Sequence, residues 1–119
     1  MVGMKRITSG SLGIQQGSRV LFADFADGGA MWTGQGDRES RHLISFKDAF
    51  IDAPVVTVSI SMWDIDNKHN SRADITAEKI TAKGFHLVFR TWGDTRVARV
   101  RADWTAIGPV RDDDDWEVN

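Results

Sequence analysis

Hydrophobic and polar residues alternate along several short stretches of the chain, as they do in strands with one buried face. In residues 55–62 apolar side chains fall on one face and hydroxyl side chains on the other: Val56, Val58, Ile60 and Met62 against Thr57, Ser59 and Ser61. Three later stretches repeat the pattern, with apolar faces made of Ala73, Ile75 and Ala77, then Phe85, Leu87 and Phe89, and then Ala98, Val100, Ala102 and Trp104. Each stretch is predicted to be a half-buried strand, and Trp104 is expected in the core.

Turn residues separate these strands. Lys83-Gly84 predicts a turn, Gly93-Asp94-Thr95 a tight connection, and residues 64–71 a longer polar loop. Residues 19–22 and 42–46 are two further strand candidates. Residues 28–38, which lie between them, are too rich in glycine to predict a regular element. Because the helical crossovers of a parallel sheet are missing, the pattern favours an all-β antiparallel sandwich or barrel.

A chain of 119 residues is long enough for one domain with its own core. We expect that domain to span residues 1–108, followed by an acidic tail over residues 109–119. Cysteine is absent, so neither a disulfide nor a thiolate metal site is expected. No apolar run approaches the length of a membrane span, and no apolar signal core follows the first residues. We therefore expect a soluble protein, either cytoplasmic or exported by a non-classical route.

Charge is unevenly distributed, although the formal net charge is only -2. The basic stretch contains Arg90, Arg96, Arg99 and Arg101, whereas Asp112 to Asp115 form an acidic run. A nucleic-acid site on these arginines is a minor alternative, because an arginine-rich strand is more often a solvated face.

Catalytic and metal chemistry find little support in the sequence. Asp64, Asp66 and Asn67 could suit calcium, but the glycine and distant glutamate of the helix-loop-helix calcium site are missing, which favours a solvated turn. The three histidines share no ligand spacing, and no serine lies in a nucleophile elbow. We therefore expect neither an enzyme nor a bound metal or cofactor.

Trp92 has the properties of a sugar-stacking residue. By parity it lies opposite the apolar face of its strand, and a tight turn follows it. A pyranose presents a C–H face that packs on an aromatic ring, and hydroxyls that pair with a carboxylate and a guanidinium. Galactose-type rings suit such stacking, because their axial hydroxyl leaves one face more apolar. Packing of Trp92 against a neighbouring strand or subunit is an equally strong interpretation.

Several ordered blocks resemble the H-type lectins, the family of snail agglutinins and discoidin C-terminal domains. They are Phe46-x3-Phe50-x3-Pro54-Val55-Val56-x-Val58-Ser59-Ile60, Arg72, Ile80-Thr81-x2-Gly84-Phe85, Thr91-Trp92-x2-Thr95-x-Val97 and Trp104-x-Ala106-Ile107-Gly108. The resemblance runs from about Ser9 to Gly108. It implies a six-stranded antiparallel β-sandwich that forms homotrimers or homohexamers and acts in cell adhesion. It also implies metal-free binding of N-acetylgalactosamine or galactose in clefts between protomers.

The resemblance also implies site residues. Arg72 matches an arginine that donates to sugar hydroxyls, and Trp92 matches a tryptophan that stacks on the ring. Gly93 falls where a snail agglutinin has a histidine, so that side-chain contact would be missing. Ungapped counting places Gly34-Gln35 at the family's glycine and aspartate, whereas a two-residue shift uses Gly36 and Asp37.

We favour Gly36 and Asp37, because a carboxylate is the better acceptor for two hydroxyls. That Asp37 merely pairs with Arg38 or caps a turn is nearly as strong an interpretation. The leading hypothesis is a multivalent, non-catalytic lectin for glycans ending in galactose or N-acetylgalactosamine. The alternative is a structural or protein-interaction module that kept the scaffold without sugar binding.

Overall fold

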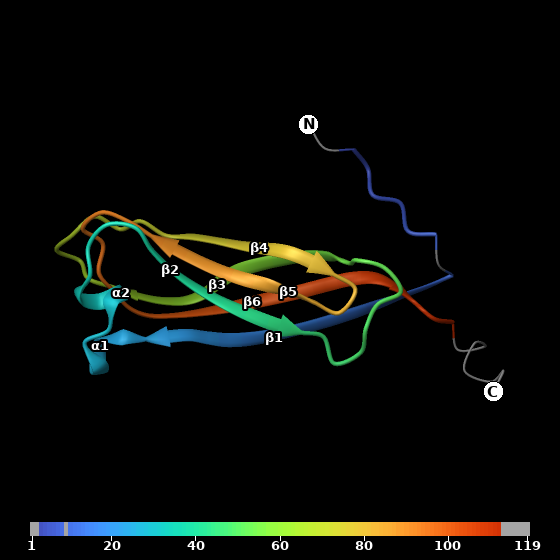
Figure 1. The fold of residues 1–119 in the computed structure, drawn as a ribbon, viewed down its shortest axis with the longest axis horizontal. Helices are drawn as coiled ribbons and strands as arrows, with labels where there is room; N and C mark the ends of the chain where they lie inside the picture. Colours follow the sequence, from blue (N-terminus) through green and yellow to red (C-terminus); the bar gives the residue numbers. More distant parts are fainter. Residues whose placement is uncertain (1–2, 9, 113–119) are drawn as a thin grey trace.

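The computed structural model describes residues 3–8 and 10–112, which form two three-stranded antiparallel sheets (Figure 1). The strands are β1 (Ser11–Ala23), β2 (Arg38–Ser45), β3 (Val55–Ile65), β4 (Asp74–Thr81), β5 (Gly84–Thr91) and β6 (Val97–Val110). One sheet has the order β1-β6-β3 and the other β2-β5-β4. The all-β, six-stranded antiparallel sandwich expected from the sequence is confirmed.

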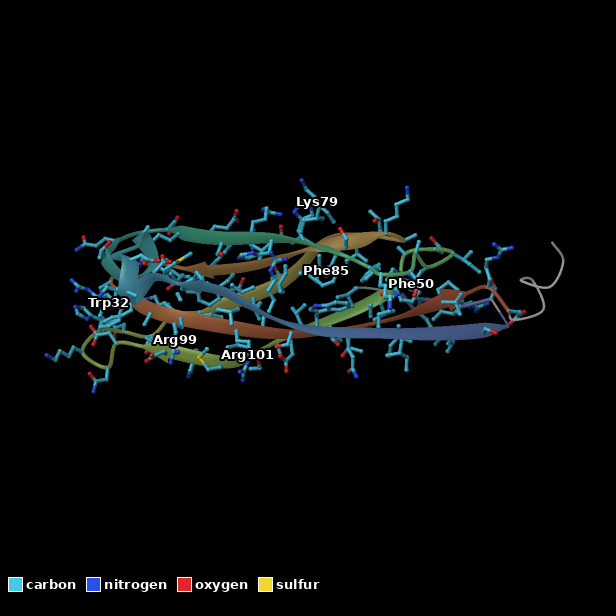
Figure 2. The ribbon with its side chains drawn as sticks, turned by 90° about the horizontal axis from the view of Figure 1, so that it is seen from below. Trp32, Phe50, Lys79, Phe85, Arg99 and Arg101 are labelled. Carbon is cyan, nitrogen blue, oxygen red and sulfur yellow. The ribbon has the colours of Figure 1, made fainter. Side chains whose placement is uncertain are left out.

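The core lies between the two sheets and follows the predicted alternation. Phe85, Leu87 and Phe89 of β5 are fully buried, and so are Val100 and Ala102 of β6. Edge-on, the two layers enclose Phe85 and Phe50, whereas Arg99 and Arg101 project from the outer face of one sheet and Lys79 from the other (Figure 2). This burial confirms the inward faces that were predicted for β5 and β6.

Trp104 lies at the margin of this core. Its indole is half-buried and packs against Phe46 and Phe85, with ring centroids 5.9 and 5.5 Å apart, respectively. Gly17 of β1 is paired with Trp104, and a Cβ atom there would lie 2.8 Å from the indole Nε1. The indole therefore fills space that a side chain at position 17 would otherwise occupy.

Some sequence expectations were incomplete or wrong. The candidate at residues 19–22 is only the end of β1, which starts at Ser11. A register shift between Ile60 and Met62 places Met62 opposite the outward-facing Arg101, so Met62 does not continue the inward face of β3. The glycine-rich segment also contains a regular element, the single-turn helix α2 (Ala30–Thr33), and the helix α1 (Asp24–Asp27) precedes it.

Strand β6 extends to Val110 and therefore includes the first two residues of the segment expected as a tail. Arg111 and Asp112 follow the strand, and residues 113–119, which hold Asp113 to Asp115, lie outside the described residues. The division at residue 108 thus stays a prediction. Within the described ranges, no helix is both long enough and apolar enough to cross a membrane.

Two arginines and two glutamates form a closed set of ion pairs on the outer face of the β2-β5-β4 sheet. Glu78 pairs with Arg41 at 3.0 Å and with Arg90 at 2.8 Å. Glu39 pairs with the same two arginines at 3.3 and 3.0 Å. Val88 lies between Arg41 and Thr76 in the register and is fully buried, although its side chain faces outward.

One end of the sandwich collects loops from both sheets. The helices α1 and α2, the loop between β3 and β4, and the connection between β5 and β6 all lie at this end, whereas β1 begins and β6 ends at the other (Figure 1). The candidate residues Gly36, Asp37, Arg72, Trp92 and Gly93 belong to these loops.

Candidate functional site

Two buried threonines attach the β3–β4 loop to the β5–β6 connection. The hydroxyl of Thr91 donates a hydrogen bond to the carbonyl oxygen of Arg72 at 2.6 Å. The Thr95 hydroxyl accepts the backbone N–H of Arg72 at 3.1 Å and donates to the carbonyl oxygen of Asn70 at 2.5 Å. Both threonines are almost completely buried, so these bonds hold the backbone of Arg72 beside the turn that carries Trp92.

Trp92 directly follows β5 and is exposed, with 42% of its surface accessible. The preceding Thr91 faces inward with Phe89, so the alternation of the strand directs the next side chain outward. This exposure agrees with the parity argument from the sequence. An indole that is partly exposed at a turn offers a flat apolar surface of which the protomer covers only a part.

The Arg72 guanidinium lies over the turn that follows Trp92. Its Nη1 atom is 2.5 Å from Oδ1 of Asp94. Gly93 has a φ of 69°, and a Cβ atom at that position would lie 3.0 Å from Nη1 of Arg72. Glycine is therefore favoured at position 93 for two reasons, its left-handed backbone and the guanidinium beside it.

The segment before β2 reaches the same turn. The backbone N–H of Gly36 donates to the carbonyl oxygen of Gly93 at 3.0 Å. Nη2 of Arg38 donates to that same oxygen at 3.2 Å. Asp37 therefore sits between two residues that are both bonded to Gly93, while Gly34 instead caps α2 by donating to Ala30.

Asp37 itself is exposed, and among residues 3–8 and 10–112 its carboxylate has neither a hydrogen bond nor an ion pair. The guanidinium of Arg38 instead donates to four carbonyl oxygens, those of Gly36, Ala30, Met31 and Gly93. Partial burial lowers the pKa of Arg38. Pairing between Asp37 and Arg38, one of the two alternatives considered for this carboxylate, is thus not observed.

Asp94 is the residue that sequence reasoning missed at this site. It was interpreted only as part of a tight connection, yet its carboxylate pairs with Arg72 and accepts the Asn70 backbone N–H at 3.5 Å. The hydrogen bond from Arg72 is the main reason why the pKa of Asp94 lies below its ordinary value. In the sequence, the only signal for Asp94 was its position two residues after Trp92.

The residues considered for calcium or nucleic acid do not gather into a site. Asp64 pairs with Arg99 at 3.5 Å, whereas Asp66 pairs with Nδ1 of His69 at 2.7 Å and caps the backbone of Lys68. Within the described parts of the chain, no group of three or more potential ligands is arranged to hold a metal ion. Arg90 lies on the outer face of one sheet and Arg99 on that of the other, so the arginines do not form one basic surface.

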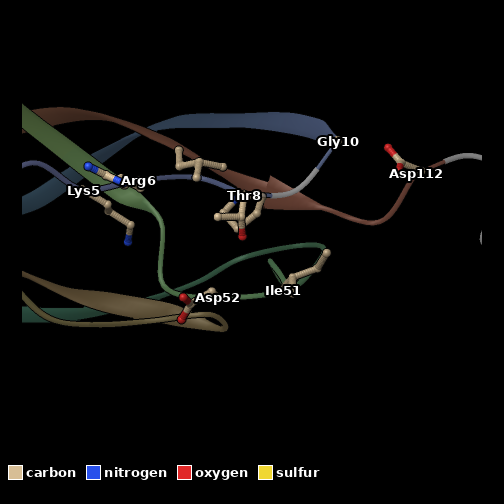
Figure 3. Close-up of a pocket in the computed structure, with 9 residues that line it drawn as sticks. Lys5, Arg6, Thr8, Gly10, Ile51, Asp52 and Asp112 are labelled. Carbon is tan, nitrogen blue, oxygen red and sulfur yellow. The ribbon is translucent and has the colours of Figure 1, made fainter.

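A hollow of about 350 Å³ lies at the opposite end of the sandwich from the candidate residues (Figure 3). The N-terminal segment forms one wall with Lys5, Arg6 and Thr8, while Ile51 and Asp52 form the other. The ammonium group of Lys5 donates to the carbonyl oxygen of Ala53 and ties the two walls together. None of the candidate residues lines this hollow.

Comparisons with known proteins agree with this architecture. Residues 41–107 match the H-type lectin domain, which is more than half of the chain. The protein "ATP synthase subunits region ORF 7" of Fuscovulum blasticum is 65% identical over 108 residues, covering 91% of this chain and 94% of that protein. A discoidin-1 chain of Dictyostelium discoideum is 35% identical over 81 residues, covering 67% of this chain but only 32% of the discoidin.

The structure of discoidin II from Dictyostelium discoideum shares the fold, with a TM-score of 0.73 at 24% sequence identity. The alignment covers 88% of this chain and 40% of the discoidin II chain, so the likeness concerns one part of that larger protein. Lectin domains bind carbohydrate without transforming it. The matched domain, together with the two-sheet fold, shows that this chain belongs to the H-type lectin family and is a non-enzymatic, carbohydrate-binding protein.

Proposed function

We propose that this protein binds galactose or N-acetylgalactosamine through the surface formed by Gly36, Asp37, Arg72, Trp92 and Gly93. The observation that carries this proposal is the exposed indole of Trp92 next to a turn over which a guanidinium lies. An aromatic face, a cation and a carboxylate are the groups that a pyranose needs.

In the proposed complex the apolar face of the sugar packs on the indole of Trp92. Arg72 donates to ring hydroxyls, and the unpaired carboxylate of Asp37 accepts from them. The contact between Gly36 and Gly93 supports Asp37 over Gln35, because this contact brings the segment of Asp37 to the Trp92 turn. Gly93 contributes space, since the guanidinium of Arg72 lies where a side chain at position 93 would begin.

We further propose that the protein is a homotrimer or homohexamer in which neighbouring protomers complete each sugar cleft. Support comes from the outer face of the β1-β6-β3 sheet, where Ile14, Ile107 and Val55 stand opposite one another in a single row across all three strands. All three side chains are exposed in the single chain. Such a row favours contact with another copy.

Assembly would also compensate for weak single sites. A small polar ligand is commonly held at near-millimolar affinity, equivalent to about 4 kcal/mol. Several sites on one oligomer gain by avidity when a surface presents many copies of the glycan. A multivalent lectin of this kind suits cell adhesion, in which two glycan-bearing surfaces are held together.

The test combines a glycan array with two variants, Trp92→Ala and Arg72→Ala. We expect the wild-type protein to bind glycans ending in galactose or N-acetylgalactosamine. Both variants should lose this binding but elute as the same oligomer in size-exclusion chromatography. Binding that persists in both variants would contradict the proposed site. A wild-type protein that binds no glycan at high concentration would instead favour a protein-interaction module.

A further inference from the structure

The ion pair between Asp94 and Arg72 joins two loops at the site end, across 22 positions of sequence. The side chains are 31% exposed for Arg72 and 47% exposed for Asp94. Ion pairs as exposed as this one contribute little to folding stability. A role in holding the geometry of the site explains this pair better than a role in holding the fold.

The guanidinium of Arg72 is constrained from two directions. On one side Oδ1 of Asp94 holds Nη1 at 2.5 Å. On the other side lies Gly93, where a Cβ atom would approach Nη1 to 3.0 Å and Cζ to 3.2 Å. Since an arginine side chain has many rotamers, restricting it before a ligand arrives lowers the entropy that binding must overcome.

The pairing leaves other donors of the guanidinium for a ligand. Arg72 has five N–H donors in a planar fork, and the Asp94 pair involves only the Nη1 group. That bond and the closeness of Gly93 restrict the orientation of the guanidinium, so the remaining N–H groups have a preferred direction. Trp92 precedes Gly93, which places its exposed ring on the same turn as this fork.

We propose that Asp94 is the positioning residue of the sugar site, holding the Arg72 guanidinium over Gly93 so that its free donors meet sugar hydroxyls beside Trp92. The inference rests on the proposed galactose-binding function. Asp94 acts through Arg72 and makes no contact with the sugar. The acceptor carboxylate remains that of Asp37.

The experiment measures N-acetylgalactosamine affinity by following the Trp92 indole N–H signal in NMR titrations of the full chain. We expect Asp94→Ala to weaken binding about tenfold, a change of about 1.4 kcal/mol. Asp94→Asn should recover part of the loss, because its amide oxygen can still accept from Arg72. Asp64→Ala removes another exposed aspartate that pairs with an arginine, and it should bind like the wild type.

A double-mutant cycle separates positioning from direct contact. Arg72→Lys keeps a cation but loses the planar fork, so Asp94→Ala should cost less affinity in that background than in the wild type. Wild-type affinity in Asp94→Ala, or the same fold-loss in both backgrounds, would overturn the proposal.

A ligand-free measurement separates this inference from the proposed function. The Nε–H signal of Arg72, assigned by its absence in Arg72→Lys, should be sharp and distinct in the wild type and averaged in Asp94→Ala. If the wild type binds no sugar, the lectin proposal fails, and this signal alone decides whether Asp94 positions Arg72. An Nε–H signal that Asp94→Ala leaves unchanged would overturn the positioning role.

Discussion

The backbone N–H of Gly36 donates a hydrogen bond to the carbonyl oxygen of Gly93 at 3.0 Å, joining the segment before β2 to the turn after β5. Both glycines have positive φ, 76° and 69°, which few other residues adopt readily. Because main-chain atoms make the bond, substitutions at Asp37 should remove a side chain without moving the segment.

Substitution of Asp37 tests which acidic acceptor the site uses. We expect Asp37→Ala to weaken galactose binding by about tenfold or more, because sugar hydroxyls then lose a charged acceptor. The thermal midpoint should hardly change, since the exposed carboxylate has no partner within the described residues. Calorimetric titration with galactose measures the effect, and Gln35→Ala is the matched control. A larger loss from Gln35→Ala would favour the ungapped alignment.

Gly93→Ala tests the close approach of Arg72. An alanine with φ near 69° costs about 1–2 kcal/mol, and its Cβ atom pushes on the guanidinium. We expect a modestly lower midpoint in urea unfolding together with a clear loss of galactose affinity. Gly28→Ala is the control, because Gly28 also has a positive φ but open space around it. Equal affinity losses in the two variants would argue against the guanidinium contact.

The strands that the sequence predicted best are those with apolar residues at every inward position. Strand β5 is the clearest case, since Phe85, Leu87 and Phe89 are all fully buried. Most of β1 escaped notice because Gly13 and Gly17 occupy inward positions there. Side chains of the paired strand fill the space, Val110 against Gly13 and Trp104 against Gly17. The hydrophobic pattern of one strand does not show which side chains of the neighbouring strand fill the core beside its glycines.

The residues of the candidate site were likewise predicted only in part. Trp92 was found from parity and Arg72 from resemblance, and the structure places both at the same turn. Asp94 was missed because its partner lies 22 positions away, and local spacing carries no trace of that contact. Met62 was misassigned because a bulge shifts the register of β3, which the unbroken alternation of residues 55–62 does not show.

The outer ion pairs of the β2-β5-β4 sheet predict acid sensitivity. Hydrogen bonds from Arg90, Thr76 and Arg41 lower the pKa of Glu78 from 4.5 to about 2. A carboxyl whose pKa is depressed by folding stabilises the native state above its unfolded pKa. This contribution should therefore be complete above about pH 4.5 and disappear as the pH falls through about 2.

Urea unfolding of the wild type and of Glu78→Gln, measured between pH 7 and pH 2, tests this expectation. The difference in unfolding free energy between the two should be largest near neutral pH and shrink as acid protonates Glu78. A difference that stays constant over this range would show that the network does not act through the charge of Glu78.

The row formed by Ile14, Ile107 and Val55 predicts where protomers meet. Ile107→Glu places a charge at the middle of this row and should dissociate the oligomer, as seen by sedimentation velocity. Leu43→Glu is the matched control, because Leu43 is an apolar residue on the other sheet and is even more exposed, 61% against 37% for Ile107. Dissociation by Leu43→Glu but not by Ile107→Glu would place the interface on the β2-β5-β4 sheet.

The most direct measurement for the whole account is a crystal structure of the protein soaked with N-acetylgalactosamine. We predict a sugar ring whose apolar face lies against the indole of Trp92, with hydroxyls within hydrogen-bonding distance of the Arg72 guanidinium and the Asp37 carboxylate. A sugar bound elsewhere, or an accessible Trp92 that stays bare at saturating sugar, would contradict it.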